Sequence, residues 1–110
     1  MEADLKTFGR VFGFPSPPSG WKVDIREDGR SGAVVYREAA GSLSFYWEFG
    51  GGETLAIIDV GDEAAWREKQ SWTAGRRAEI LQRVSGEVIR QKAPGHRAEI
   101  DERRGCLYIR

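Results

Sequence analysis

The sequence predicts an α+β fold: an antiparallel four-stranded meander, packed by one long helix in the C-terminal half of the chain, and then a terminal β-hairpin. Residues 42–60 contain two β-rich runs joined by Gly50, Gly51 and Gly52, and apolar residues occupy every second position of the first run. After Gly61 the apolar residues change to helical spacing. The 110 residues are expected to form one domain, residues 1–110.

Residues 1–20 are expected to form an ordered N-terminal arm that leads into the sheet. Leu5, Phe8 and Phe12 have the spacing of one face of a short helix. The Pro-rich segment that follows, residues 14–20, excludes regular structure, because proline fixes φ and removes a hydrogen-bond donor.

Alternating or β-rich segments predict the strands of the meander at residues 21–26, 33–38, 42–49 and 54–60. Consecutive strands are joined by short links rich in Gly, Asp or Ala, the longest at residues 27–32, which favours antiparallel pairing. The last strand contains Leu55, Ile57 and Ile58, so apolar residues lie on both of its faces. We therefore expect it to be covered on both sides.

Two helices are expected after the meander. Asp62 is a suitable cap for a short helix that ends at Lys69, and Ser71 or Thr73 for a long helix over residues 74–92. The long helix has one apolar stripe, made of the stem of Arg77 with Ile80, Leu81, Val84, Val88 and Ile89.

The long helix contains Gly86, which costs about 1 kcal/mol relative to alanine unless the sheet requires a close backbone approach there. Pro94 and Gly95 end the helix. Residues 98–101 and 106–110 then alternate again, and we expect them to form a hairpin that joins or extends the sheet.

Composition argues against several classes of partner. Lys and Arg number 17 and so do Asp and Glu, so the formal net charge is zero, which disfavours a nucleic-acid ligand. The sequence has no apolar run of about 20 residues and no signal-peptide pattern, so we expect a cytoplasmic protein without membrane contact. Cys106 is the single cysteine, which excludes an intramolecular disulfide.

No catalytic residue, metal site or cofactor is predicted. The triple glycine is followed by a β-rich run rather than a helix, so it indicates a hairpin turn and not a phosphate-binding loop. One histidine, His96, and one cysteine cannot form a structural zinc site within the chain. We expect His96 to be a surface imidazole and Cys106 a small strand side chain.

Three carboxylates suggest an alternative, a catalytic or metal-binding site on the sheet. Glu38, Glu48 and Asp59 lie on neighbouring predicted strands and could converge for glycosidic or metal-assisted chemistry. The competing interpretation is that Asp59 pairs with an arginine, such as Arg37 or Arg76.

The favoured function is a small non-enzymatic module that binds a protein partner or a second copy of itself, because Trp, Tyr and Arg dominate interface hot spots. Its size and class also fit an inhibitor or immunity-type protein of bacterial origin. The candidate binding residues are Tyr36, Tyr46, Trp47, Glu48, Trp66, Trp72 and Arg76.

Two alternatives remain open. One is a small-ligand site or enzyme with a pocket between sheet and helix, lined by Trp47, Tyr46, Trp66 and Trp72 and polarised by Glu48, Asp59 or Arg76. The other is a nucleic-acid-binding face on which Tyr36, Tyr46 and Glu48 lie beside Arg26 or Arg37.

Overall fold

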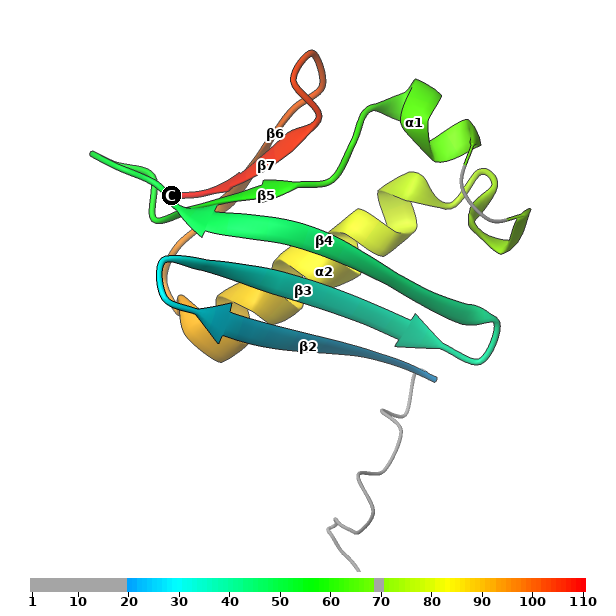
Figure 1. Cartoon of the computed structure of the whole chain (residues 1–110), viewed down its shortest axis with the longest axis horizontal. Helices are drawn as coiled ribbons and strands as arrows, with labels where there is room; N and C mark the ends of the chain where they lie inside the picture. Colours follow the sequence, from blue (N-terminus) through cyan, green and yellow to red (C-terminus); the bar gives the residue numbers. More distant parts are fainter. Residues whose placement is uncertain (1–19, 69–70) are drawn as a thin grey trace, which may run out of the picture.

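The computed structural model describes residues 20–68 and 71–110, so the expected N-terminal helix and Pro-rich arm lie outside the described residues. An antiparallel sheet packs against one long helix, and the α+β class, the meander and the terminal hairpin are confirmed (Figure 1). The strands are β2 (Trp21–Asp28), β3 (Ser31–Glu38), β4 (Gly41–Phe49), β5 (Ala56–Asp59), β6 (Ala98–Asp101) and β7 (Cys106–Ile109).

The six strands form one sheet in the order β2-β3-β4-β5-β7-β6. The terminal hairpin joins this sheet because β7 pairs antiparallel with β5, which places Leu107 opposite Ile58. The first turn is shorter than expected, since β2 continues to Asp28 and β3 starts at Ser31. Their ladder therefore extends almost to the tip of the hairpin, where Gly29 takes a φ of 67°.

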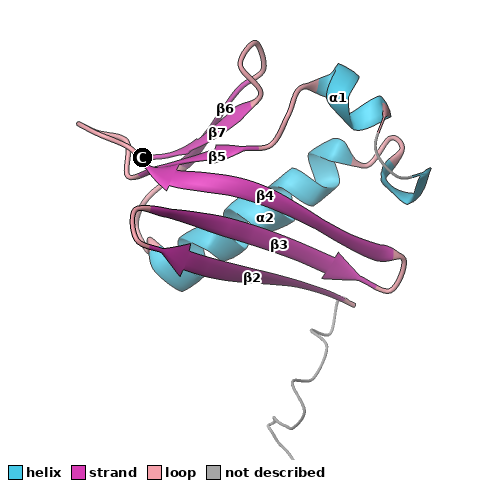
Figure 2. Cartoon of the chain, viewed as in Figure 1, coloured by secondary structure: helices cyan, strands magenta, loops and turns pink. Residues whose placement is uncertain are grey.

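Alternation along the strands gives the sheet two different faces. The face that we call the helix face carries the core and is crossed by α2, which runs behind the strands in Figure 2. The opposite face, here the open face, carries mostly polar residues, together with the buried Val35 and the half-buried Ile57. The strand residues of the core are Val23, Val34, Tyr36, Leu43, Phe45, Trp47, Ile58, Leu107 and Ile109.

The short helix α1 (Glu63–Arg67) begins as expected, because the side chain of Asp62 accepts a hydrogen bond from the Ala65 N–H at 2.9 Å. It ends at Arg67, before the expected Lys69. Trp66 anchors it: the ring stacks on Phe45, and the indole N–H donates to the Val60 carbonyl at 2.6 Å.

The long helix α2 (Arg77–Lys92) begins three residues later than expected. Ser71–Thr73 form the 3-10 turn η1, and Gly75 takes a φ of 70°, a left-handed conformation that breaks the helical path. Arg76 is consequently the N-cap, and no side chain caps the helix, so the expected cap by Ser71 or Thr73 is wrong.

The apolar stripe of α2 is confirmed, since Arg77, Ile80, Leu81, Val84 and Val88 are buried. A Cβ on Gly86 would meet nothing within 4 Å, so close approach to the sheet does not explain this glycine. No helix in the described part of the chain combines the length and apolar character that a bilayer crossing requires.

The expectation that the last meander strand is covered on both sides is wrong. Ile58 is buried on the helix face, whereas its neighbour Ile57 lies on the open face and is only half-buried. Asp59 and Leu55 are exposed. Four consecutive apolar residues therefore overstated the burial of this short strand.

Candidate functional site

Two of the predicted binding residues lie on the open face. Because Trp47 belongs to the core, its neighbours Tyr46 and Glu48 must point to the other side of the sheet. Tyr46 is 53% exposed, and its hydroxyl donates to the Glu48 carboxylate at 3.1 Å. These two residues form a local pair on a solvent-exposed face.

Trp47 and Trp66 belong to the core but to different parts of it. The Trp47 indole N–H donates to the Arg26 carbonyl at 3.0 Å, while Trp66 lies on α1 and stacks on Phe45. Since Tyr46 lies on the opposite face, the expectation that Trp47, Tyr46, Trp66 and Trp72 line one pocket is wrong. The sequence itself contained this conflict, because adjacent strand residues cannot share a face.

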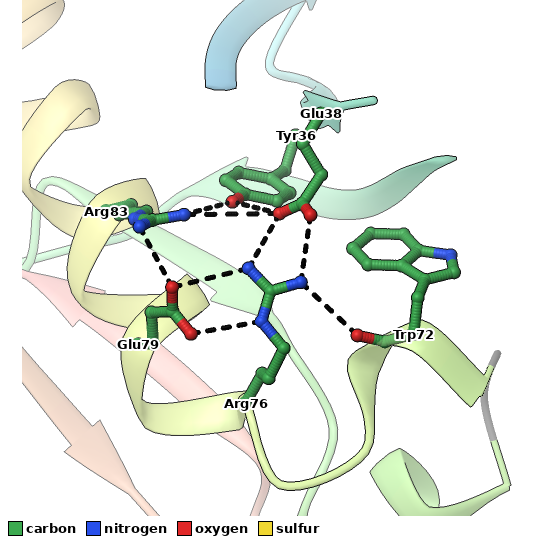
Figure 3. Close-up of polar contacts among 6 residues, drawn as sticks. All are labelled: Tyr36, Glu38, Trp72, Arg76, Glu79 and Arg83. Carbon is green, nitrogen blue, oxygen red and sulfur yellow. Dashed lines mark hydrogen bonds and ion pairs between the residues drawn. The ribbon is translucent and has the colours of Figure 1, made fainter. Parts of the chain in front are cut away.

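The other three predicted residues, Tyr36, Trp72 and Arg76, lie together in a polar cluster between β3 and the start of α2 (Figure 3). Glu38 lies at its centre. We call the cluster the Glu38 network; its ionisable members are Tyr36, Glu38, Arg76, Glu79 and Arg83.

The Glu38 network joins strand and helix through charge-assisted hydrogen bonds. Arg76 donates from both terminal nitrogens to the two carboxylate oxygens of Glu38, each at 2.9 Å. Tyr36 donates its hydroxyl to Glu38 at 2.7 Å and accepts from Arg83 at 2.8 Å. Glu79 completes the network with Arg76 at 3.0 Å and Arg83 at 2.9 Å.

The pKa shifts in this network follow from its contacts. Hydrogen bonds from Arg76, and then from Tyr36, lower the pKa of Glu38 although desolvation opposes the shift. Burial raises the pKa of the Tyr36 hydroxyl, and its hydrogen bond to Glu38 acts in the same direction. The carboxylates of Glu38 and Glu79 raise the pKa of Arg76.

Charge balance determines what the Glu38 network can do. It contains two guanidinium groups and two carboxylates, and each carboxylate already accepts from an arginine. Arg83 also lies over the Trp21 ring at 5.2 Å, and Arg76 over the Trp72 ring at 5.8 Å. This arrangement is suited to attaching α2 to the sheet rather than to reacting with a substrate.

The proposed convergence of carboxylates is wrong. Glu38 lies on the helix face, whereas Glu48 and Asp59 lie on the open face. The two arginines suggested for Asp59 form ion pairs elsewhere, Arg37 with Asp24 at 3.7 Å and Arg76 with Glu38. Across residues 20–68 and 71–110, no three His, Cys, Asp or Glu side chains could hold a metal ion together.

Tyr36 and Tyr46 do not share one face, as the nucleic-acid alternative requires, because Tyr36 is fully buried on the side of the sheet opposite Tyr46. Cys106 is half-buried, and burial together with Asp59 and Asp101 raises the pKa of its thiol, which disfavours the reactive thiolate. His96 is exposed after the end of α2, as expected.

A predominantly apolar site lies at the other end of α2. There an apolar cavity of about 240 Å³ opens between the helix and the sheet. We call it the apolar hollow. It is lined by Ile25, Glu27, Val34, Trp47, Phe49, Leu55, Ala56, Ile58, Val88, Lys92, Ala93 and Ile109.

Backbone contacts hold the mouth of the apolar hollow in place. The Leu55 N–H donates to the Ile109 carbonyl at 2.7 Å, and the Leu55 carbonyl accepts from Gly50 at 2.9 Å. Phe49 packs edge-on against Trp47, with 5.0 Å between ring centroids. Phe49 and Leu55 are each 38% exposed, which is unusual for large apolar side chains.

The rim of the hollow carries one ion pair, formed by Lys92 and Glu27 at 3.1 Å. Both side chains are about half exposed, so water screens this pair and its contribution to stability is small. These are the ionisable residues among those that line the hollow, and they neutralise each other.

Sequence reasoning found only Trp47 of the hollow. It missed Phe49 and Leu55, which flank the triple-glycine link, and Lys92 at the end of α2. One signal was present: Phe49 continues the alternation of Leu43, Phe45 and Trp47 to the last residue of β4. An apolar residue at a strand end, next to a glycine-rich loop, is a candidate for incomplete burial.

The chain matches no family model, and the searches of curated proteins and of solved structures gave no significant match. Functional inference therefore depends on the geometry of the site.

Proposed function

We propose that this chain is a non-enzymatic protein-interaction module that receives one large apolar side chain of a partner protein in the apolar hollow. The observation that carries the proposal is the hollow itself, a concave apolar site whose mouth exposes Phe49 and Leu55. Interface hot spots commonly consist of such anchor side chains in fully desolvated pockets.

The size of the hollow favours a single side chain over a metabolite. Pockets for small molecules usually have volumes of about 300–1,000 Å³, whereas this cavity is about 240 Å³. Its Glu27–Lys92 pair supplies a charged rim around an apolar centre, which is the usual arrangement of a protein interface.

The test compares two arginine substitutions at exposed sites. Leu55→Arg places a charge at the mouth, while its backbone hydrogen bonds can remain. Tyr46→Arg is the control, because Tyr46 is even more exposed and lies on the open face. Wild type and both variants are used to capture proteins from a native extract of the source cells at moderate salt, with mass spectrometry of everything retained.

Support requires one stoichiometric partner that wild type and Tyr46→Arg retain and Leu55→Arg loses. With that partner purified, Leu55→Arg should weaken binding by about 30-fold, the equivalent of a hot-spot loss of about 2 kcal/mol. Equal binding by all three chains overturns the proposal. Apolar compounds that raise the melting temperature of wild type but not of Leu55→Arg, with no protein retained, would establish a ligand site instead.

A further inference from the structure

Among residues 20–68 and 71–110, the two edges of the sheet differ in length. At one edge, β6 has four residues; at the other, β2 has eight and pairs with β3 on one side. A long edge strand presents backbone N–H and C=O groups on which a further strand can pair.

The side chains of β2 on the open face alternate in charge: Lys22, Asp24, Arg26 and Asp28. Within one chain, Asp24 already pairs with Lys22 at 3.5 Å and with Arg37 at 3.7 Å, so an approaching copy adds to or exchanges these contacts. If a second copy of β2 lies antiparallel with Ile25 opposite Ile25, Lys22 faces Asp28 and Asp24 faces Arg26. Two-fold symmetry gives each pair twice, so all eight charges meet an opposite charge. A shift that places Asp24 opposite itself brings Lys22 opposite Arg26, so like charges meet and that register is disfavoured.

We propose that two copies of this chain pair antiparallel through β2, with Ile25 on the two-fold axis, and so join their sheets into one. On the helix face, Ile25 is half-buried within one chain and would pack against its own copy. This self-association goes beyond the proposed function. It uses the edge of β2, whose Ile25 and Glu27 also line the hollow, and it does not use Leu55 at the mouth.

Gln91 regulates access to this edge. Its side-chain nitrogen donates to the Val23 carbonyl at 3.0 Å and to Glu87 at 3.0 Å. The first bond occupies a main-chain acceptor of the edge strand, so an approaching copy must share or displace it. Removing the side chain with Gln91→Ala should therefore tighten self-association several-fold.

A charge-exchange experiment tests both the surface and its register. The acidic variant carries Lys22→Glu and Arg26→Glu, and the basic variant carries Asp24→Lys and Asp28→Lys. Sedimentation velocity should show a dimer for wild type that weakens with salt, monomers for each variant alone, and a heterodimer when the two are mixed. Circular dichroism and melting temperature verify that each variant is folded.

A cross-link gives a second measurement that does not depend on charge. In a Cys106→Ser background, Ile25→Cys should form a disulfide dimer on oxidation, because opposed strand residues have Cα separations of about 4.5–5.5 Å and disulfides accept this range. Arg30→Cys, in the adjacent turn, is the control and should not cross-link preferentially.

A wild type that stays monomeric throughout the measurable concentration range overturns the inference, and so does a mixture of the variants that contains no heterodimer. Leu55→Arg separates this inference from the proposed function. It should leave the dimer unchanged while abolishing partner capture, so either proposal can fail without the other.

Discussion

The two ends of α2 are attached to the sheet by different means. At the N-terminal end, Arg76 and Arg83 bind Glu38 and Tyr36 of β3, and aromatic rings pack over both guanidinium groups. At the C-terminal end, one hydrogen bond from Gln91 and one exposed ion pair of Lys92 reach β2, beside the apolar hollow. A binding site requires unfilled space, and here that space lies at the end of α2 that has fewer polar contacts to the sheet among the described residues.

The largest effect should come from breaking the strongly attached end. Glu38→Ala leaves the donors of Arg76 and Tyr36 without their main acceptor in a partly buried site. We expect the free energy of unfolding to fall by about 2–3 kcal/mol, the range for a hydrogen-bonded charge left unsatisfied. Urea denaturation measures this loss.

The matched control is Glu99→Ala, because Glu99 also accepts from two arginines, Arg97 and Arg110. The side chain of Glu99 is 40% exposed, compared with 15% for Glu38, so its pairs are better screened. We therefore expect a clearly smaller loss for Glu99→Ala than for Glu38→Ala. Equal losses in the two variants would show that the Glu38 network is not a special attachment.

A smaller effect should appear as a pH dependence of this attachment. The pKa of Glu38 is lowered, so the folded state favours the carboxylate, and the resulting stabilisation is complete above the unfolded-state pKa of about 4.3. As pH falls through the folded-state pKa of Glu38, protonation of the carboxylate removes this stabilisation.

Urea midpoints between about pH 7 and pH 3 should therefore converge for wild type and Glu38→Gln. The comparison with Glu38→Gln removes the parallel contributions of Glu87 and Glu99, whose pKa values are also lowered and which lie outside the Glu38 network. A difference in urea midpoint between wild type and Glu38→Gln that stays constant at all pH values would show that the Glu38 carboxylate is not the source of the pH dependence.

The smallest effect should come from filling the weakly attached end. Ala56 lines the apolar hollow, so Ala56→Val adds carbon atoms to empty apolar space and should stabilise the fold by about 1 kcal/mol. Ala33→Val is the control, because Ala33 is a half-buried strand alanine on the open face. Thermal unfolding compares the melting temperatures of the two variants. A lower melting temperature for Ala56→Val would mean that neighbouring side chains already fill the hollow.

The periodic part of this fold could be predicted from sequence. The stripe of α2 and the alternation of β4 depend on local spacing, and both are confirmed. The start of α2 was missed because Gly75 adopts a left-handed conformation that outweighs the capping signals of Ser71 and Thr73.

The sites were less predictable, for two physical reasons. Glu38 and Arg76 are 38 residues apart, and nothing in the local pattern selects this partner among 17 basic residues. The apolar hollow is a space that remains where the last turn of α2, the β4–β5 loop and β2 fail to fill the volume between them. A volume of this kind follows from tertiary packing, and the pattern of one segment cannot indicate it.

Gly32 lies opposite Trp47 in the β3–β4 ladder. A Cβ at position 32 would overlap the Arg26 carbonyl oxygen and come within 2.9 Å of the Trp47 indole nitrogen. The orientation of the Trp47 indole therefore requires that position 32 has no side chain. This indole forms a wall of the hollow. In evolutionary terms the two positions are coupled: a lineage that replaces this glycine should lose the tryptophan too, and with it the shape of the hollow.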